Sequence, residues 1–176
     1  MKFTREKRAD IRLGDMVIVS DPCYGLNTWC QGVLENVLPG NYKCMIEFLD
    51  DNSEKRVSAI TVCHEEYEDN LGYAPEYDAE PFEVGVDSGR AGIFDYAYYA
   101  KYHSDRHNPE HVNEEWYSRV GKCSYMGDTI DGYGLVSSSG YGDGGYTCWT
   151  AKNPDGMVYS ILIEFITEED NDEDIG

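Results

Sequence analysis

The chain has 176 residues, a formal net charge of −20 and 41% hydrophobic residues, which suits one globular domain of roughly 100–200 residues. Its apolar runs are only a few residues long, so we expect neither a membrane span of about 20 apolar residues nor a secretory signal. The composition also excludes a collagen, a coiled coil and a secreted disulfide-rich protein. Because an acidic body repels phosphates and anionic lipids, we expect no nucleic acid or membrane partner. The acidity either attracts cations or a basic protein, or serves only to keep the protein soluble.

The distribution of charge and cysteine predicts a simple organisation. Residues 1–12 form a basic N-terminal segment, residues 13–167 a single β-rich domain, and residues 168–176 an acidic disordered tail. The six cysteines include no C-x-x-C pair and do not have the spacing of a zinc ribbon or finger. Several of them, such as Cys44 and Cys63, lie in apolar runs, which favours buried free thiols and a cytoplasmic location.

The first half of the chain consists of short apolar runs separated by turn residues. The predicted strands here are Met16–Ser20, Tyr42–Leu49, Val57–His64, Phe82–Val86 and Ala91–Phe94. The second and third of these are spaced as a hairpin. The acidic and tyrosine-rich residues 65–80 contain Gly72 and Pro75, which predicts a long surface loop.

The second half begins with helical signals and ends in strands. Tyr96–Tyr102 is predicted to form one or two helical turns, and Glu110–Arg119 a helix with Asn108 as its cap and Pro109 at its first position. The predicted strands that follow are Leu135–Ser139, Tyr146–Ala151 and Met157–Ile166. The turn Asn153-Pro154-Asp155-Gly156 joins the last two as a hairpin. We therefore expect a mainly β (α+β) fold, a single compact β-sandwich or barrel-like domain with one or two short helices.

A glycine-rich segment, Gly140-Tyr141-Gly142-Asp143-Gly144-Gly145, matches G-x-G-x-x-G literally. A dinucleotide fold requires a helix after this motif, whereas the residues that follow are typical of a strand. A kinase glycine loop lies between strands, but the accompanying lysine, catalytic-loop and D-F-G elements are absent from the chain. The remaining interpretations are a tight structural turn, or a turn that also presents Asp143 to a ligand.

Three aspartates occur at turns that follow or interrupt strands, and the fold can gather them at one end. Either they form a ligand site, or each makes only local turn hydrogen bonds. The candidate ligand-binding residues are Asp21, Asp87, Ser88, Gly142, Asp143 and Tyr146. We expect no cofactor, with a divalent cation as the alternative; the metal itself stays open. No catalytic residues are assigned.

Two further residue groups are candidates for binding. His103, His107 and His111 have helical spacing, but Pro109 separates the last two, which favours surface histidines over a zinc site. The chain also has 15 tyrosines, and tyrosine combines apolar area with a polar tip, as protein interfaces require. The candidate partner-binding residues are Tyr96, Tyr98, Tyr99 and Tyr102; the alternative is ordinary packing within a β-rich domain.

The order of these motifs resembles a family of bacterial and phage proteins described only as a domain of unknown function. The matching features are a G-x-[IV]-V-x-D-P turn with two extra residues (14–22), a P-G-x-Y step (39–42), V-D-x-G (86–89) and G-x-G-D-G-x-Y (140–146). The resemblance spans about residues 14–166, with no counterpart for residues 96–132 beyond Trp116. It implies one such domain and supports the three aspartates as matched positions, without supplying an activity.

We therefore expect a non-enzymatic function. The leading hypothesis is a small acidic cytosolic protein that occupies a basic surface of a partner protein, as an immunity protein or a phage counter-defence inhibitor would. One alternative is a ligand- or metal-binding domain, possibly hydrolytic, built on the turns of Asp21, Asp87 and Asp143. Another is a phage accessory or structural protein. The oligomeric state stays open.

Overall fold

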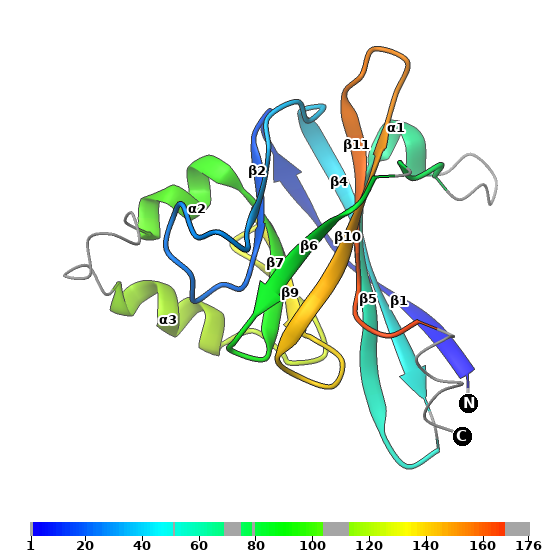
Figure 1. Cartoon of the computed structure of the whole chain (residues 1–176), viewed down its shortest axis with the longest axis vertical. Helices are drawn as coiled ribbons and strands as arrows, with labels where there is room; N and C mark the ends of the chain where they lie inside the picture. Colours follow the sequence, from blue (N-terminus) through cyan, green and yellow to red (C-terminus); the bar gives the residue numbers. More distant parts are fainter. Residues whose placement is uncertain (1, 51, 69–74, 79, 104–112, 168–176) are drawn as a thin grey trace.

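The computed structural model describes residues 2–50, 52–68, 75–78, 80–103 and 113–167. The strands form two antiparallel sheets (Figure 1). In spatial order, the six-stranded sheet consists of β1 (Lys2–Leu13), β4 (Gly40–Asp50), β5 (Lys55–His64), β11 (Val158–Glu164), β10 (Gly144–Lys152) and β6 (Phe82–Val86). The five-stranded sheet consists of β3 (Gly32–Leu34), β2 (Val17–Ser20), β7 (Arg90–Asp95), β9 (Gly134–Ser138) and β8 (Asp128–Ile130). The helices are α1 (Glu65–Glu68), α2 (Tyr96–Tyr102) and α3 (Glu114–Gly121).

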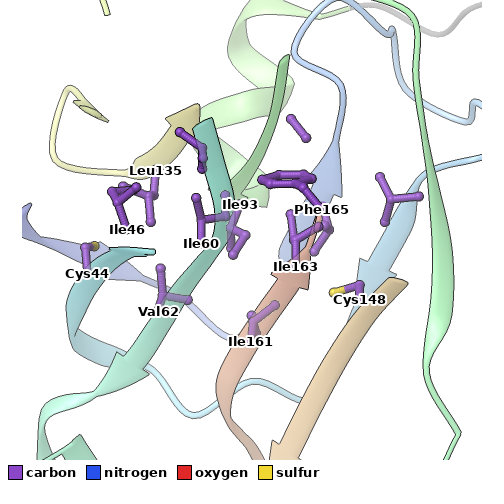
Figure 2. Close-up of a cluster of buried hydrophobic side chains, with 14 of the residues drawn as sticks. Cys44, Ile46, Ile60, Val62, Ile93, Leu135, Cys148, Ile161, Ile163 and Phe165 are labelled. Atoms are coloured by element: carbon purple, nitrogen blue, oxygen red, sulfur yellow. The ribbon is translucent and has the colours of Figure 1, made fainter. Parts of the chain in front are cut away.

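The main hydrophobic core lies between the two sheets. Alternate residues of β4 point into it, namely Tyr42, Cys44, Ile46 and Phe48, because successive side chains of a strand face opposite ways. Figure 2 shows Ile46 and Ile60 of the larger sheet near Ile93 and Leu135 of the smaller one. The prediction of a single mainly β domain with short helices is thus confirmed, and its form is a sandwich rather than a closed barrel.

A second core lies on the far face of the five-stranded sheet, where α2 and α3 cover it (Figure 1). Trp116 of α3 is 1% exposed and packs edge-on against Phe94 of β7. All four residues of β2 are buried. A strand with core on both faces has a continuous apolar sequence rather than an alternating one, which explains the run Met16–Ser20.

The turn residues place the hairpins where the sequence predicts them. Asn153 Oδ1 accepts the amides of Asp155 and Met157, each at 3.0 Å, and Gly156 has φ of 81°. This left-handed conformation favours glycine. β4 and β5 also form the expected hairpin. By contrast, β6 and β7 flank one short turn but belong to different sheets, so residues 87–89 carry the chain from one sheet to the other.

Two segments differ from the sequence interpretation in their boundaries. The basic residues 2–13 form β1, which pairs with β4 at one edge of the larger sheet. Helix α3 begins at Glu114, and the Oδ1 of Asn113 accepts the Trp116 amide at 3.2 Å as its cap. The predicted cap Asn108, the first position Pro109, and the acidic segment 168–176 lie outside the described residues.

The described helices are short, and none is both long and apolar enough to cross a membrane. All six cysteines are free thiols, and five of them are buried. The exception is Cys23, which lies in the loop between β2 and β3.

Candidate functional site

The carboxylate of Asp21 joins the loop after β2 to the turn between β6 and β7. Its side chain is fully buried. Oδ2 accepts the amides of Asp87 and Ser88 at 2.8 and 2.7 Å, while Oδ1 accepts the Ser88 hydroxyl and the Cys23 amide, both at 2.8 Å. Four donors satisfy the lone pairs of a carboxylate. Asp21 therefore holds together two turns separated by 66 positions in the chain.

Helices α2 and α3 hold the main chain of the same loop. The carbonyl oxygen of Pro22 accepts the Trp116 indole N–H at 2.7 Å and lies 3.0 Å from Nε2 of His103. The buried Tyr99 hydroxyl donates to the carbonyl of Tyr24 at 2.5 Å. These loop carbonyl groups have no hydrogen-bond partner in a neighbouring strand that the structure describes, and side chains of the two helices supply the partners that buried backbone groups require. In Figure 1 this loop passes beside both helices.

The second half of the loop is fixed by Gln31. Its Nε2 donates to Ser20 Oγ at 3.0 Å and to the carbonyl of Gly25 at 2.7 Å, and its Oε1 accepts the Thr28 amide at 2.9 Å. Thr28 Oγ1 donates to the same Gly25 carbonyl at 2.8 Å. These bonds close the loop on itself. We call residues 21–31 the anchored loop.

The anchored loop presents an indole to solvent. Trp29 is 86% exposed, the highest value among the exposed large hydrophobic side chains of the described residues. Its immediate neighbour Cys30 is buried, and the Cys30 carbonyl accepts the Gly85 amide at 3.0 Å. The backbone next to the indole is therefore tied to β6 while the side chain itself points outward. Exposed tryptophan is uncommon, and tryptophan is enriched among the residues that dominate protein interfaces.

The glycine-rich turn lies beside the first two turns. The hydroxyl of Tyr146 donates to the carbonyls of Gly142, at 2.5 Å, and Ser139, at 2.9 Å. The Ser139 amide donates to the carbonyl of Gly89 at 3.0 Å, and a Cβ built on Gly89 would lie 4.0 Å from Oδ1 of Asp143. The three predicted turns therefore converge at one end of the sandwich. The glycine-rich segment leads into β10 and not into a helix.

The three aspartates have different environments at this end. Asp21 is buried, whereas Asp87 and Asp143 are exposed, and the Tyr24 hydroxyl donates to Oδ2 of Asp87 at 2.5 Å. Because four hydrogen-bond donors occupy the oxygens of Asp21, this carboxylate has no lone pair left for a cation. Among the described residues no group of three or more His, Cys, Asp or Glu side chains is placed to hold a metal ion.

The four tyrosines expected at a partner surface are packed into the second core. Tyr99 is fully buried and Tyr98 is 5% exposed, while Tyr96 and Tyr102 are half-buried against the same cluster. The prediction of an exposed tyrosine surface on α2 is wrong for Tyr98 and Tyr99, because α3 and its Trp116 cover this helix. His103 stacks on Tyr99; His107 and His111 lie outside the described residues.

Burial suppresses ionisation around the anchored loop. It raises the pKa of the Tyr99 phenol above its usual range, and it raises the pKa of the Cys23 thiol, with the Asp21 carboxylate adding to the effect. Burial lowers the pKa of His103, although hydrogen bonds to the carbonyls of Tyr99 and Pro22 oppose this. A thiol held protonated is a poor nucleophile, so Cys23 is poorly suited to nucleophilic attack at neutral pH.

Sequence reasoning missed the residues that complete this site. Trp29, Gln31 and His103 were not assigned to the aspartate turns, because their contacts depend on how loop, helices and sheets come together. A signal for Trp29 was nevertheless present. It lies in the polar stretch Gly25–Gln31 and not in an apolar run, which is an unusual setting for a core tryptophan.

Comparison with known proteins identifies a family without identifying an activity. No curated protein and no solved structure matched the chain. The model of one protein family, described as "Protein of unknown function (DUF4241)", matches residues 13–163. The match covers β2 to β10 and most of β11, including all three aspartate turns and the anchored loop. The chain therefore belongs to the DUF4241 family of proteins of unknown function.

Proposed function

We propose that this protein is a small acidic binding protein that occupies a basic surface of a partner protein, with the anchored loop as its contact element. The observation that carries the proposal is the pairing of an 86% exposed Trp29 with a loop fastened to both sheets and both covering helices. In the cell such a protein would act as an inhibitor, of the kind that neutralises a toxin or a host defence protein.

Preorganisation supports this role for the loop. Binding loses free energy when a flexible loop must be ordered, and a loop already fixed in its bound shape avoids that cost. Here Asp21, Gln31 and the carbonyl of Pro22 fix the loop before any partner arrives. Loops that carry binding residues on a rigid scaffold are a common arrangement in proteins.

Charge supports a basic partner. Asp87 and Asp143 are exposed on the turns next to the anchored loop, and the whole chain carries a net charge of −20. Complementary charge accelerates encounter and sets specificity, while a central aromatic side chain supplies most of the affinity. The expected partner surface is therefore an indole-sized apolar pocket with lysine or arginine at its rim.

The cysteines support a cytoplasmic site of action. All six are free, including Cys23 on the exposed side of the anchored loop. An exposed free thiol persists in a reducing compartment and is oxidised in a secreted protein.

The test uses a photo-crosslinking amino acid at position 29 and, as a control, at position 117. Tyr117 is 45% exposed on α3 and lies outside the anchored loop. In cells of the source organism, a partner should crosslink from position 29 and not from position 117. The captured protein is then purified and titrated with the wild type and with Trp29→Ala, which should weaken binding by roughly 2–4 kcal/mol.

The charge component is tested separately with Asp87→Asn. This variant should bind less tightly at low ionic strength and should lose part of its dependence on salt, because it removes one screened interaction. Equal crosslinking from positions 29 and 117, or unchanged affinity of Trp29→Ala, would contradict the proposal.

A further inference from the structure

A hollow of about 440 Å³ lies on the outer face of the six-stranded sheet, away from the anchored loop and the main core. Side chains of β4, β5 and β11 form its floor, and Tyr67 and Tyr77 stand at one side. Its volume lies within the range of about 300–1,000 Å³ typical of small-molecule sites. The remaining question is which chemistry its lining accepts.

One cross-strand row of this floor has no positive charge between its two carboxylates. Arg5 pairs in register with Glu47, Glu47 with Ala59, and Ala59 with Glu164. In spatial order the row is therefore positive at Arg5, negative at Glu47, uncharged at Ala59 and negative at Glu164. A second basic side chain at position 59 would continue the alternation, but alanine stands there between the two carboxylates. Strands lie about 4.8 Å apart, so the backbones of Glu47 and Glu164 are separated by about 10 Å. The methyl group of Ala59 leaves the space between their side chains unfilled.

The two carboxylates differ in their existing partners. Glu47 accepts the Ser58 hydroxyl at 2.9 Å and forms a 3.4 Å ion pair with Arg5, whose side chain is 72% exposed. None of the ion pairs among the described residues includes Glu164. Two like charges that face the same hollow repel each other, and a cation between them removes that repulsion.

The neighbouring row is mainly apolar. Met45 pairs in register with Thr61, and Thr61 with Leu162, on the same face of the sheet and within the hollow. Beyond this row, Tyr67 stacks on Tyr159 with ring centroids 4.2 Å apart. A ligand lying across both rows meets carboxylates at one end and mainly apolar or aromatic side chains at the other. Lys43 also lines the hollow, in the row beyond, where its ammonium group forms a 2.8 Å ion pair with Asp10.

We propose that this hollow binds an organic cation, a primary amine or guanidine with an apolar body. The cationic group lies above Ala59 between Glu47 and Glu164, and the body lies on Met45, Thr61 and Leu162. The same chemistry is found in free amines and in lysine or arginine side chains of peptides. This site lies apart from the anchored loop and does not depend on the function proposed for it.

The test is a titration of the purified full chain with hexylamine, phenylethylamine and agmatine at about 0.15 M salt, followed by calorimetry and by amide chemical shifts. Hexanol serves as the uncharged control, and a short lysine-containing peptide represents the side-chain source. The amines should bind saturably, with shifts confined to β4, β5 and β11, and hexanol should bind roughly tenfold more weakly or worse. If the peptide binds more tightly than the free amines, the source is a peptide side chain; if it binds less tightly, the source is a free amine.

Two carboxylate variants separate a specific site from general attraction to an acidic protein. Glu164→Gln should weaken amine binding by roughly tenfold or more, whereas Asp155→Asn, in the exposed β10–β11 turn, should leave it within about twofold. Ala59→Lys places an ammonium in the gap and should abolish amine binding in a chain whose amide spectrum stays native. The proposal is overturned if no amine binds saturably, if hexanol binds as tightly, or if the two carboxylate variants weaken binding equally.

Discussion

Asp21 and Ser88 share two hydrogen bonds across 67 positions of the chain, one from the Ser88 amide at 2.7 Å and one from its hydroxyl at 2.8 Å. Asp21 follows β2 of the smaller sheet, and Ser88 lies in the turn that leaves β6 of the larger sheet. One buried carboxylate therefore fastens the two sheets to each other at the end where the anchored loop lies.

Replacement of Asp21 should destabilise the whole domain. In the wild type the Asp21 carboxylate accepts four hydrogen bonds from N–H and O–H groups. In Asp21→Asn the side-chain NH₂ group is itself a donor and faces some of these donors, and the strong hydrogen bonds to a buried charge are lost. We expect the free energy of unfolding to fall by about 2–4 kcal/mol in urea titrations. Asp143→Asn, at an exposed carboxylate of the adjacent turn, should change it by no more than about 0.5 kcal/mol. Equal stability of the two variants would show that Asp21 makes only local turn contacts.

Replacement of Tyr146 should loosen the glycine-rich turn. Tyr146→Phe keeps the ring packed against Phe165 but removes the donor to the carbonyls of Ser139 and Gly142. The expected loss of stability is about 1 kcal/mol, together with faster amide hydrogen exchange at Gly142, whose amide donates to Ser139. Unchanged exchange at Gly142 in the variant would mean that the glycines alone hold the turn.

His103 should make the stability of the domain depend on pH. Burial lowers its folded-state pKa below the ordinary value of 6.5, so between these two values the unfolded chain binds more protons than the folded one. The free energy of unfolding should therefore fall as the pH falls through about 6.5 toward the folded pKa, with no further loss from this group below it. Subtracting the profile of His103→Gln from that of the wild type isolates the effect from the carboxylates. The prediction is contradicted if the difference in free energy of unfolding between the wild type and His103→Gln does not change with pH, or if it rises toward acid pH.

The six thiols should differ in their reactivity toward a thiol-modifying reagent. Cys23 is exposed and the other five cysteines are buried, so a thiol reagent should modify one group per native chain and six after denaturation. The reaction at Cys23 should remain slow at pH 7 and accelerate at higher pH than for an ordinary thiol, because partial desolvation of its sulfur and the nearby Asp21 carboxylate raise its pKa, although the residue as a whole is exposed. Cys23→Ser should abolish labelling of the native chain; persistent labelling would indicate that a buried cysteine becomes exposed.

Trp29 should be dispensable for folding. Its exposure of 86% implies that Trp29→Ala changes the free energy of unfolding by no more than about 0.5 kcal/mol. The variant should also lose the most readily quenched part of the fluorescence in acrylamide, since Trp116 is 1% exposed and Trp149 is half-buried. A large loss of stability would assign the indole a packing role and would remove the reason to regard the anchored loop as a contact element.

Local signals in the sequence predicted the fold class and the principal hairpins, because turn residues such as Asn153 and Gly156 determine their own neighbourhood. Three strands were missed. β1 carries charged side chains on most of its length and is a strand because β4 pairs with it, and β3 and β8 have three residues each. The pairing partner of β1 lies far along the chain, where propensity carries no information, and three residues are too few for β3 or β8 to show the alternating pattern of a strand.

The candidate site, like the fold, could be predicted only in part from the sequence. Convergence of the three aspartate turns at one end was one of two interpretations that their positions after strands allowed, the other being local turn hydrogen bonds alone. The division of roles among the three could not be predicted. Asp21 is buried and fully bonded while Asp143 is exposed, and the difference arises from the way loop 21–31 fits beneath α2 and α3. The burial of Tyr98 and Tyr99 has the same origin, since α3 is what covers them.

The strand order of the larger sheet also constrains how the chain acquires its structure during synthesis. β5 receives one neighbour, β4, from the adjacent hairpin, but its other neighbour is β11, almost a hundred residues later. Until β11 leaves the ribosome, the open side of β5 has no strand to pair with, and pairing between distant segments is slow to form. Newly made chains therefore pass through a period in which β5 is vulnerable to aggregation, and a truncation before residue 158 should leave them there permanently.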